Sequence, residues 1–180
     1  NYFRQPNSQA TGAATKGILT AQLAAAESRL PQDETLEAVA KRLDALINAE
    51  AEFKGLRDQI SIEMTPEGLR IHLMEKDDSL FFDIGSATLK PAIRGLLGLI
   101  ARVAGRLPNE VAIEGHTDSR PYQGGLRDYS NWELSADRAN SARRAMEESG
   151  LRPRQATRVV GYADHRLLEP ESPRDAKNRR

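Results

Sequence analysis

Two segments with apolar residues at every second position constrain the fold of this chain more than any other sequence feature. They cover residues 60–64 and 69–73, and the sequence Thr-Pro-Glu-Gly at 65–68 lies between them. A two-residue period places alternate side chains on one face of a strand. Proline at the second and glycine at the fourth position favour a tight turn. This region is therefore predicted to form a β-hairpin.

After the hairpin, helix and strand patterns alternate. Residues 91–107 carry apolar side chains at helical spacing and begin with a proline, whereas 111–115 is a short strand pattern. A capping-box sequence opens an alanine-rich helix over 130–150, and a second strand pattern follows at 157–161. Residues 163–180 are predicted to be mostly loop. Such alternation predicts an α/β (α+β) sandwich, with helices on one face of a mixed sheet.

The N-terminal part of the chain divides into two further segments. Apolar residues at spacings of three and four predict a helix over 33–56, with Asp33 as its N-cap. Its narrow apolar stripe is expected to pack on its own domain, although a second copy of the chain is an alternative. The predicted organisation is therefore a flexible segment at 1–32, a helical segment at 33–59 and a main domain at 60–180.

Composition excludes several classes of protein. Lysine and arginine together number 26, and aspartate and glutamate also number 26, so no net charge favours nucleic acid as a partner. The chain has no cysteine, which excludes disulfides and cysteine-ligated zinc. No apolar stretch approaches the roughly 20 residues of a membrane-spanning helix. Because the chain starts at Asn1, we expect it to be a fragment of a longer protein.

The densest polar cluster is the sequence Gly-His-Thr-Asp at 115–118, at the end of a predicted strand, where α/β folds collect ligands. The carboxylate of Asp118 could accept hydrogen bonds from an ammonium, and Arg138 could bind a carboxylate with its planar guanidinium. Together they would suit a zwitterion. Chemistry alone favours a simpler interpretation, in which Asp118 caps a turn and Arg138 pairs with Asp137 or Glu133.

A metal-dependent hydrolase using His116 and Asp118 is a second alternative. However, His72 and His165 lie on other segments without ligand spacing, so a structural role for His116 is favoured. The chain contains no nucleophile elbow, zinc-protease helix or phosphate-binding loop. We therefore expect no enzyme activity, no metal and no cofactor.

Three sequence blocks resemble the OmpA-like peptidoglycan-binding family. They are Gly-His-Thr-Asp at 115–118, Asn-Trp-Glu-Leu-Ser-Ala-Asp-Arg-Ala-Asn at 131–140 and Asn-Arg-Arg at 178–180. Within the family, the block at 129–140 and the extended loop at 119–128 resemble the periplasmic part of flagellar motor stator B subunits. Tyr-Phe-Arg-Gln-Pro at 2–6 resembles the end of the amphipathic plug of that subgroup.

The resemblance implies a set of site residues. In the family, the aspartate of the first block holds the ammonium of diaminopimelate in a peptidoglycan stem peptide, and the arginine of the second block holds its carboxylate. These correspond to Asp118 and Arg138. The remaining residues that the resemblance assigns to the peptidoglycan site are Asp83, Thr117, Asn131, Leu134 and Arg179.

The resemblance also implies a function. It predicts a non-catalytic domain that anchors a motility and chemotaxis motor to peptidoglycan. It further implies a homodimer in the periplasm, with the helix of 33–56 or the one after Ser130 near the two-fold axis. An upstream inner-membrane helix and a stator A subunit partner would belong to the membrane part. A general wall-anchoring protein of the OmpA or Pal type is the alternative within the same fold.

One departure from the family pattern concerns the C-terminus. Family members normally continue beyond the Asn-Arg-Arg motif into a final strand, whereas this sequence ends at Arg180. Without that strand, we expect Arg179 to be poorly anchored.

Overall fold

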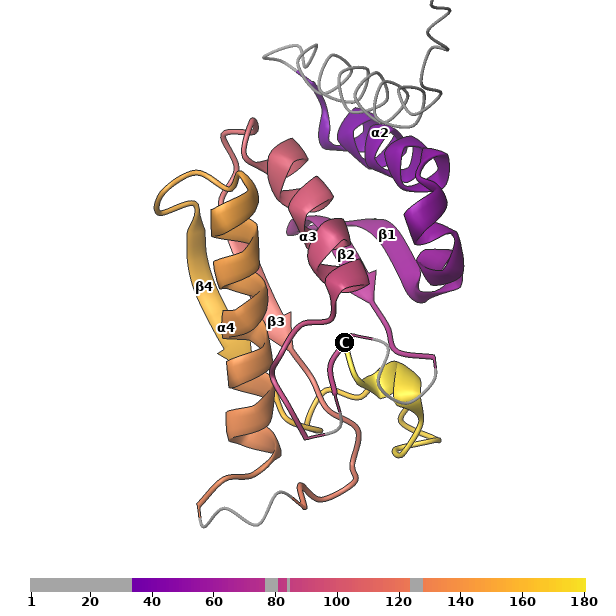
Figure 1. Cartoon of the computed structure of the whole chain (residues 1–180), viewed down its shortest axis with the longest axis vertical. Coiled ribbons are helices and arrows are strands. Elements are labelled where there is room, and N and C mark those ends of the chain that lie inside the picture. The colour runs from indigo at the N-terminus through magenta and orange to yellow at the C-terminus, as the bar shows by residue number, and fades with distance from the viewer. Residues whose placement is uncertain (1–33, 77–80, 84, 124–127) are drawn as a thin grey trace, which may run out of the picture. The chain divides into compact units, whose positions relative to one another are not determined.

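The computed structural model describes residues 34–76, 81–83, 85–123 and 128–180. Residues 34–180 belong to one compact unit, shown in Figure 1. The predicted flexible segment at 1–32, with its plug-like Tyr-Phe-Arg, lies outside the described residues, and so does Asp33.

The order of elements after residue 34 is helix, hairpin, helix, strand, helix and strand, as the sequence predicts. The structure adds two short 3-10 helices, one before the hairpin and one near the C-terminus. The elements are α2 (Leu36–Ala49), η1 (Ala51–Gln59), β1 (Ile60–Thr65), β2 (Gly68–Leu73), α3 (Pro91–Ala104), β3 (Val111–Gly115), α4 (Asn131–Ser149), β4 (Ala156–Gly161) and η2 (Ala176–Asn178).

The first helix is shorter than predicted, because its caps lie elsewhere. Thr35, not Asp33, is the N-cap of α2, and its hydroxyl accepts a hydrogen bond from the backbone N–H of Ala38 at 3.3 Å. After Ala49 the chain continues as η1 rather than as α-helix. The predicted apolar stripe is buried within the compact unit and comprises Val39, Leu43, Leu46 and Ile47. The expectation that this stripe packs on its own domain is therefore confirmed.

In the part of the chain that the structure describes, the four strands form two small sheets of opposite type. β1 and β2 are antiparallel in the predicted hairpin register, with Thr65 opposite Gly68. β3 and β4 are parallel, as expected when a helix connects them. Figure 1 shows α4 running in front of β3, and α2 contacts both strands of the hairpin. The combination of helices with small sheets matches the predicted α/β (α+β) class, but the described strands form two separate pairs rather than the single mixed sheet expected.

Two glycines allow α4 to lie unusually close to the parallel pair. A Cβ atom at Gly115, the last residue of β3, would lie 2.1 Å from the backbone oxygen of Ser135 on α4. At Gly161, the last residue of β4, it would lie 2.5 Å from the backbone nitrogen of Ala136. Neither position has room for a larger residue. This close approach brings the start of α4 beside the loop that follows β3.

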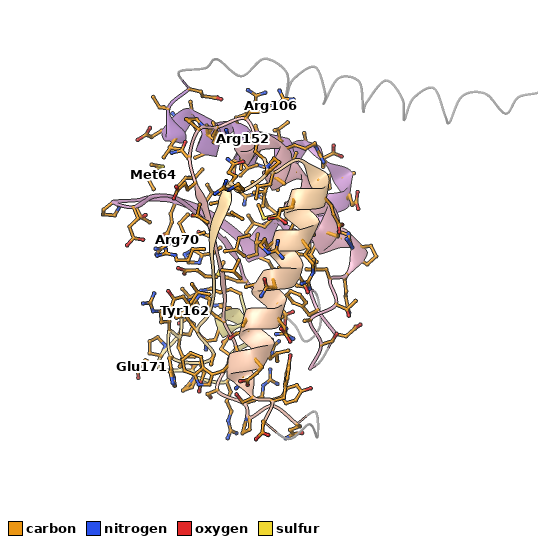
Figure 2. The ribbon with its side chains drawn as sticks, turned by 90° about the vertical axis from the view of Figure 1, so that its left-hand side faces the viewer. Met64, Arg70, Arg106, Arg152, Tyr162 and Glu171 are labelled. Atoms are coloured by element: carbon orange, nitrogen blue, oxygen red, sulfur yellow. The ribbon has the colours of Figure 1, made fainter. Side chains whose placement is uncertain are left out.

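Buried polar contacts fix the opposite end of α4. The side chain of Gln155 is buried and donates to the backbone oxygens of Ala104 at 2.8 Å and Asn109 at 2.9 Å. Arg152 donates to the oxygen of Leu107 at 2.5 Å, and Figure 2 labels Arg152 near Arg106 at this end. The turns that end α3 and α4 are therefore bound together.

Among the described helices, none is long and apolar enough to cross a membrane.

Candidate functional site

A cavity of about 240 Å³ lies where the loop after β3 meets the first turns of α4. Six of the seven residues assigned from the sequence resemblance line it: Thr117, Asp118, Asn131, Leu134, Arg138 and Arg179. Their common placement follows from helix geometry, because Asn131, Leu134 and Arg138 recur at spacings that share one face of α4. The predicted capping box, in which Ser130 and Glu133 bond reciprocally, fixes where this helix begins.

Arg138 is a buried cation without a carboxylate partner. Its side chain is only 7% exposed, and it takes part in no ion pair among the described residues. Its Nε donates to the backbone oxygen of Ser86 at 2.9 Å, and the Phe82 ring centre lies 4.7 Å from its Cζ. Burial therefore lowers the pKa of Arg138 from its ordinary value, although negative charge on Glu75 opposes the shift. The simpler interpretation from the sequence, an exposed pair with Asp137 or Glu133, is wrong.

Asp118 is equally buried but has several hydrogen-bond donors. Its Oδ1 accepts the backbone N–H of Arg120 at 2.9 Å, so it does cap a turn, as the simpler interpretation predicted. Its Oδ2 accepts from Nη2 and Nε of Arg120, at 2.7 and 3.1 Å. It also accepts from Nη1 of Arg179 at 2.8 Å. These donors, two of them cationic side chains, offset the cost of burying this carboxylate.

Arg179 connects Asp118 to a second buried carboxylate. Its Nε donates to Oε2 of Glu75 at 2.6 Å, and both side chains are largely buried. Burial alone would lower the pKa of Arg179, but the hydrogen bonds and charges of Glu75 and Asp118 outweigh it and raise that pKa. The backbone oxygen of Arg179 accepts from the N–H of Glu75 at 3.0 Å, and that of Arg180 accepts from His116 at 2.8 Å. The expectation that Arg179 is poorly anchored is thus wrong.

Polar groups of the remaining lining residues also face this region. Asn131 donates from Nδ2 to the backbone oxygen of Arg120 at 2.9 Å and so ties the loop after β3 to α4. The hydroxyl of Thr117 is buried without a hydrogen-bond partner among the described residues. An unsatisfied buried hydroxyl carries a free-energy cost that a bound polar ligand would relieve.

Asp83 is the one assigned residue that the structure does not bring into the cavity lining. Its carboxylate lies 3.3 Å from Nζ of Lys90 and is mostly exposed. Only its backbone oxygen, 3.5 Å from Nη2 of Arg138, contacts a lining side chain.

Sequence reasoning missed five lining residues that carry polar or aromatic groups, namely Glu75, Phe82, Arg120, Tyr122 and Gln123. Glu75 is 3% exposed and follows β2 closely, so a carboxylate directly after a strand was the available signal. Arg120 stands two positions after Asp118, a spacing at which a side chain can fold back on the preceding carboxylate.

The side chain of His116 is buried and packed, as expected for a structural role. Its ring is 5% exposed and stacks on Tyr162, labelled in Figure 2, with 5.1 Å between ring centres. Burial, reinforced by the positive charge of Arg180, lowers the pKa of His116 to about 3. Within the residues that the structure describes, no group of three or more His, Asp or Glu side chains could hold a metal ion.

Comparisons with known proteins show which family and which proteins this chain is similar to. The model of the OmpA family matches residues 81–180. Motility protein B of Escherichia coli strain K12 is 43% identical over 138 residues, which are 77% of this chain and 45% of that protein. The chain thus spans less than half the length of this relative.

Solved structures support the same fold. A MotB-like protein from Desulfovibrio vulgaris superposes with a TM-score of 0.61 at 20% identity, over 82% of this chain and 90% of that one. The cell wall anchor of the type VI secretion system of Pseudomonas aeruginosa superposes with a TM-score of 0.54 at 23% identity, over 68% of this chain and 83% of that one.

Proposed function

Because the chain belongs to the OmpA family, we propose that it is a non-catalytic domain that anchors a flagellar motor stator to the cell wall. Its cavity binds the diaminopimelate of a peptidoglycan stem peptide. Arg138 receives the carboxylate and Asp118 receives the ammonium of this zwitterionic side chain. Asn131, Thr117 and Leu134 shape the cavity, while Arg179 holds Asp118 in place and Asp83 remains a peripheral candidate.

One observation carries this proposal: the guanidinium of Arg138 is buried beside a cavity and forms no ion pair with any carboxylate of the described residues. A buried cation without a counter-ion is unfavourable unless hydrogen bonds and a partner charge compensate it. Two backbone oxygens and a ring face supply part of that compensation. A ligand carboxylate would supply the rest through charge-assisted hydrogen bonds, for which arginine is the best suited side chain.

The remaining parts of the proposal concern the whole protein. By analogy with the relative named Motility protein B, the protein would be anchored in the inner membrane by an upstream helix and work in the periplasm with a stator A subunit. It would act as a homodimer. Sedimentation of residues 34–180, compared with the full-length protein, tests whether this part of the chain dimerises.

The proposed wall binding is tested by pull-down with purified sacculi. Replacement of Arg138 by alanine should abolish retention, because the ligand carboxylate loses its buried cation. Arg143→Ala is the matched control, since Arg143 lies on the same helix but pairs with Glu147 and does not line the cavity. Retention of folded Arg138→Ala would contradict the assigned role. Release of soluble wall fragments by the wild-type protein would instead favour the hydrolase alternative.

A further inference from the structure

The ammonium position on Asp118 is already occupied in the free domain. Three N–H groups converge on its Oδ2, two from Arg120 and one from Arg179, at distances of 2.7 to 3.1 Å. A carboxylate oxygen offers about two lone-pair directions. An incoming ammonium therefore has no free direction at Oδ2 unless one of the two guanidinium groups leaves, and Oδ1 already accepts the backbone N–H of Arg120.

Of these two arginines, Arg120 is the one that is able to leave. The side chain of Arg179 is 11% exposed and is also held by Glu75 at 2.6 Å. The side chain of Arg120 is 45% exposed. Although Asp118 is buried, solvent can hydrate the exposed guanidinium of Arg120 once it leaves, which offsets part of the lost ion pair. Displacing Arg120 thus costs much less than displacing Arg179.

The backbone of Arg120 is fixed independently of its side chain. Its N–H donates to Oδ1 of Asp118 at 2.9 Å, and its oxygen accepts from Nδ2 of Asn131 at 2.9 Å. Rotation of the side chain into solvent therefore requires no movement of the loop.

Displacement of Arg120 would also balance the charges that line the cavity. With Arg120 turned inward, the cavity lining carries three arginines and two carboxylates, an excess of one positive charge. When Arg120 turns outward, two arginines and two carboxylates remain. A balanced lining suits a zwitterion, whereas an excess cation opposes the ammonium end of the ligand.

We propose that Arg120 is an internal competitor for the ammonium of the ligand: its guanidinium occupies Asp118 in the free domain and is displaced when the zwitterion binds. This proposal rests on the proposed function. Arg120 thereby lowers the affinity for the wall and selects ligands that carry a free ammonium, because only a cation can replace it on Asp118.

The test is calorimetric titration with a stem peptide containing diaminopimelate, and with the same peptide acetylated at the free amine of that residue. R120Q should bind the unmodified peptide about three- to fivefold more tightly than the wild type, as expected for removal of a half-exposed ion pair. It should bind the acetylated peptide no better than the wild type does. R120A is a second variant with the same expectation, and R143Q removes an equal charge away from the cavity and should change neither affinity.

The outcomes separate the two proposals. Failure of the wild type to bind either the unmodified peptide or sacculi would contradict the proposed function itself. Wild-type binding combined with unchanged or weaker binding by folded R120Q and R120A would overturn the role of Arg120. An equal gain for the acetylated peptide would overturn it as well, since the gain would not depend on the ammonium.

Discussion

The two buried arginines of the cavity, Arg138 and Arg179, are compensated in different ways. Arg179 lies between Glu75 and Asp118, with hydrogen bonds of 2.6 and 2.8 Å. Arg138 has backbone oxygens and the ring of Phe82 instead. Arg179 therefore forms direct ion pairs with two carboxylates, whereas Arg138 forms none within the part of the chain that the structure describes.

This difference indicates that Arg179 has a structural role and that Arg138 has a binding role. Removing Arg179 would leave two buried carboxylates without their shared cation. Removing Arg138 would take away a charge that the fold does not neutralise with any described carboxylate. We therefore expect Arg179 to contribute mainly to stability and Arg138 mainly to ligand binding.

The largest effect on stability is expected from Arg179→Ala. Breaking a buried ion pair by removing one partner costs about 3–5 kcal/mol of unfolding free energy. Arg138→Ala should change it by only about 1 kcal/mol, since the lost hydrogen bonds go to neutral carbonyls and the burial of a cation is relieved. Urea denaturation of both variants measures this contrast. Equal losses would show that the two arginines do not differ as described.

The position of Arg138 beside the cavity depends on the close approach of α4 to β3. Gly115→Ala should lower the unfolding free energy by about 3 kcal/mol, because the new Cβ would overlap the backbone oxygen of Ser135. Gly55→Ala is the matched control, since a Cβ there meets no atom within 4 Å. Thermal denaturation of both variants tests this expectation. A Gly115→Ala protein as stable as the control would mean that the helix can move away without loss.

A smaller, pH-dependent effect is expected from His116. Its pKa is lowered to about 3 in the folded state from 6.5, so the unfolded chain binds the proton more readily. The neutral, buried ring of His116 therefore contributes to the free energy of unfolding. This contribution is complete above pH 6.5 and is lost as the pH falls toward 3. Between pH 6 and 5 the loss should be about 1 kcal/mol per pH unit.

Urea denaturation across this pH range, with His116→Gln for comparison, measures that slope. The variant lacks the titrating ring, so its stability should fall less steeply than that of the wild type. His165→Gln, at a mostly exposed position, should retain the wild-type slope. Parallel curves for the wild type and His116→Gln would contradict the neutral, buried state of His116.

Much of the fold follows from local patterns in the sequence. The hairpin at 60–73 and the capping box at Ser130 are determined by neighbours within a few positions, and both were predictable. The need for glycine at 115 and 161 was not, because it depends on contacts with Ser135 and Ala136 of α4. The N-cap of α2 was missed because Asp33 and Thr35 are both good caps. Only the packing of the helix selects between them.

The site was predictable only in part, because its electrostatics depend on residues far apart in the chain. Arg138 and Asp118 could be assigned from motifs, but Glu75 lies 104 positions from its partner Arg179. No local pattern connects them. Chemistry alone favoured an exposed partner for Arg138, because pairs of aspartate and arginine are common and arginine is rarely buried.

The proposed function depends above all on the binding of a ligand carboxylate by buried Arg138. It is tested most directly by titrating the wild type and Arg138→Gln with two stem peptides, one with diaminopimelate and one with lysine, which lacks that carboxylate. The wild type should prefer the diaminopimelate peptide by about 30-fold or more, and Arg138→Gln should bind both with nearly equal affinity. A preference that survives intact in the variant, or that is absent from the wild type, would contradict the account.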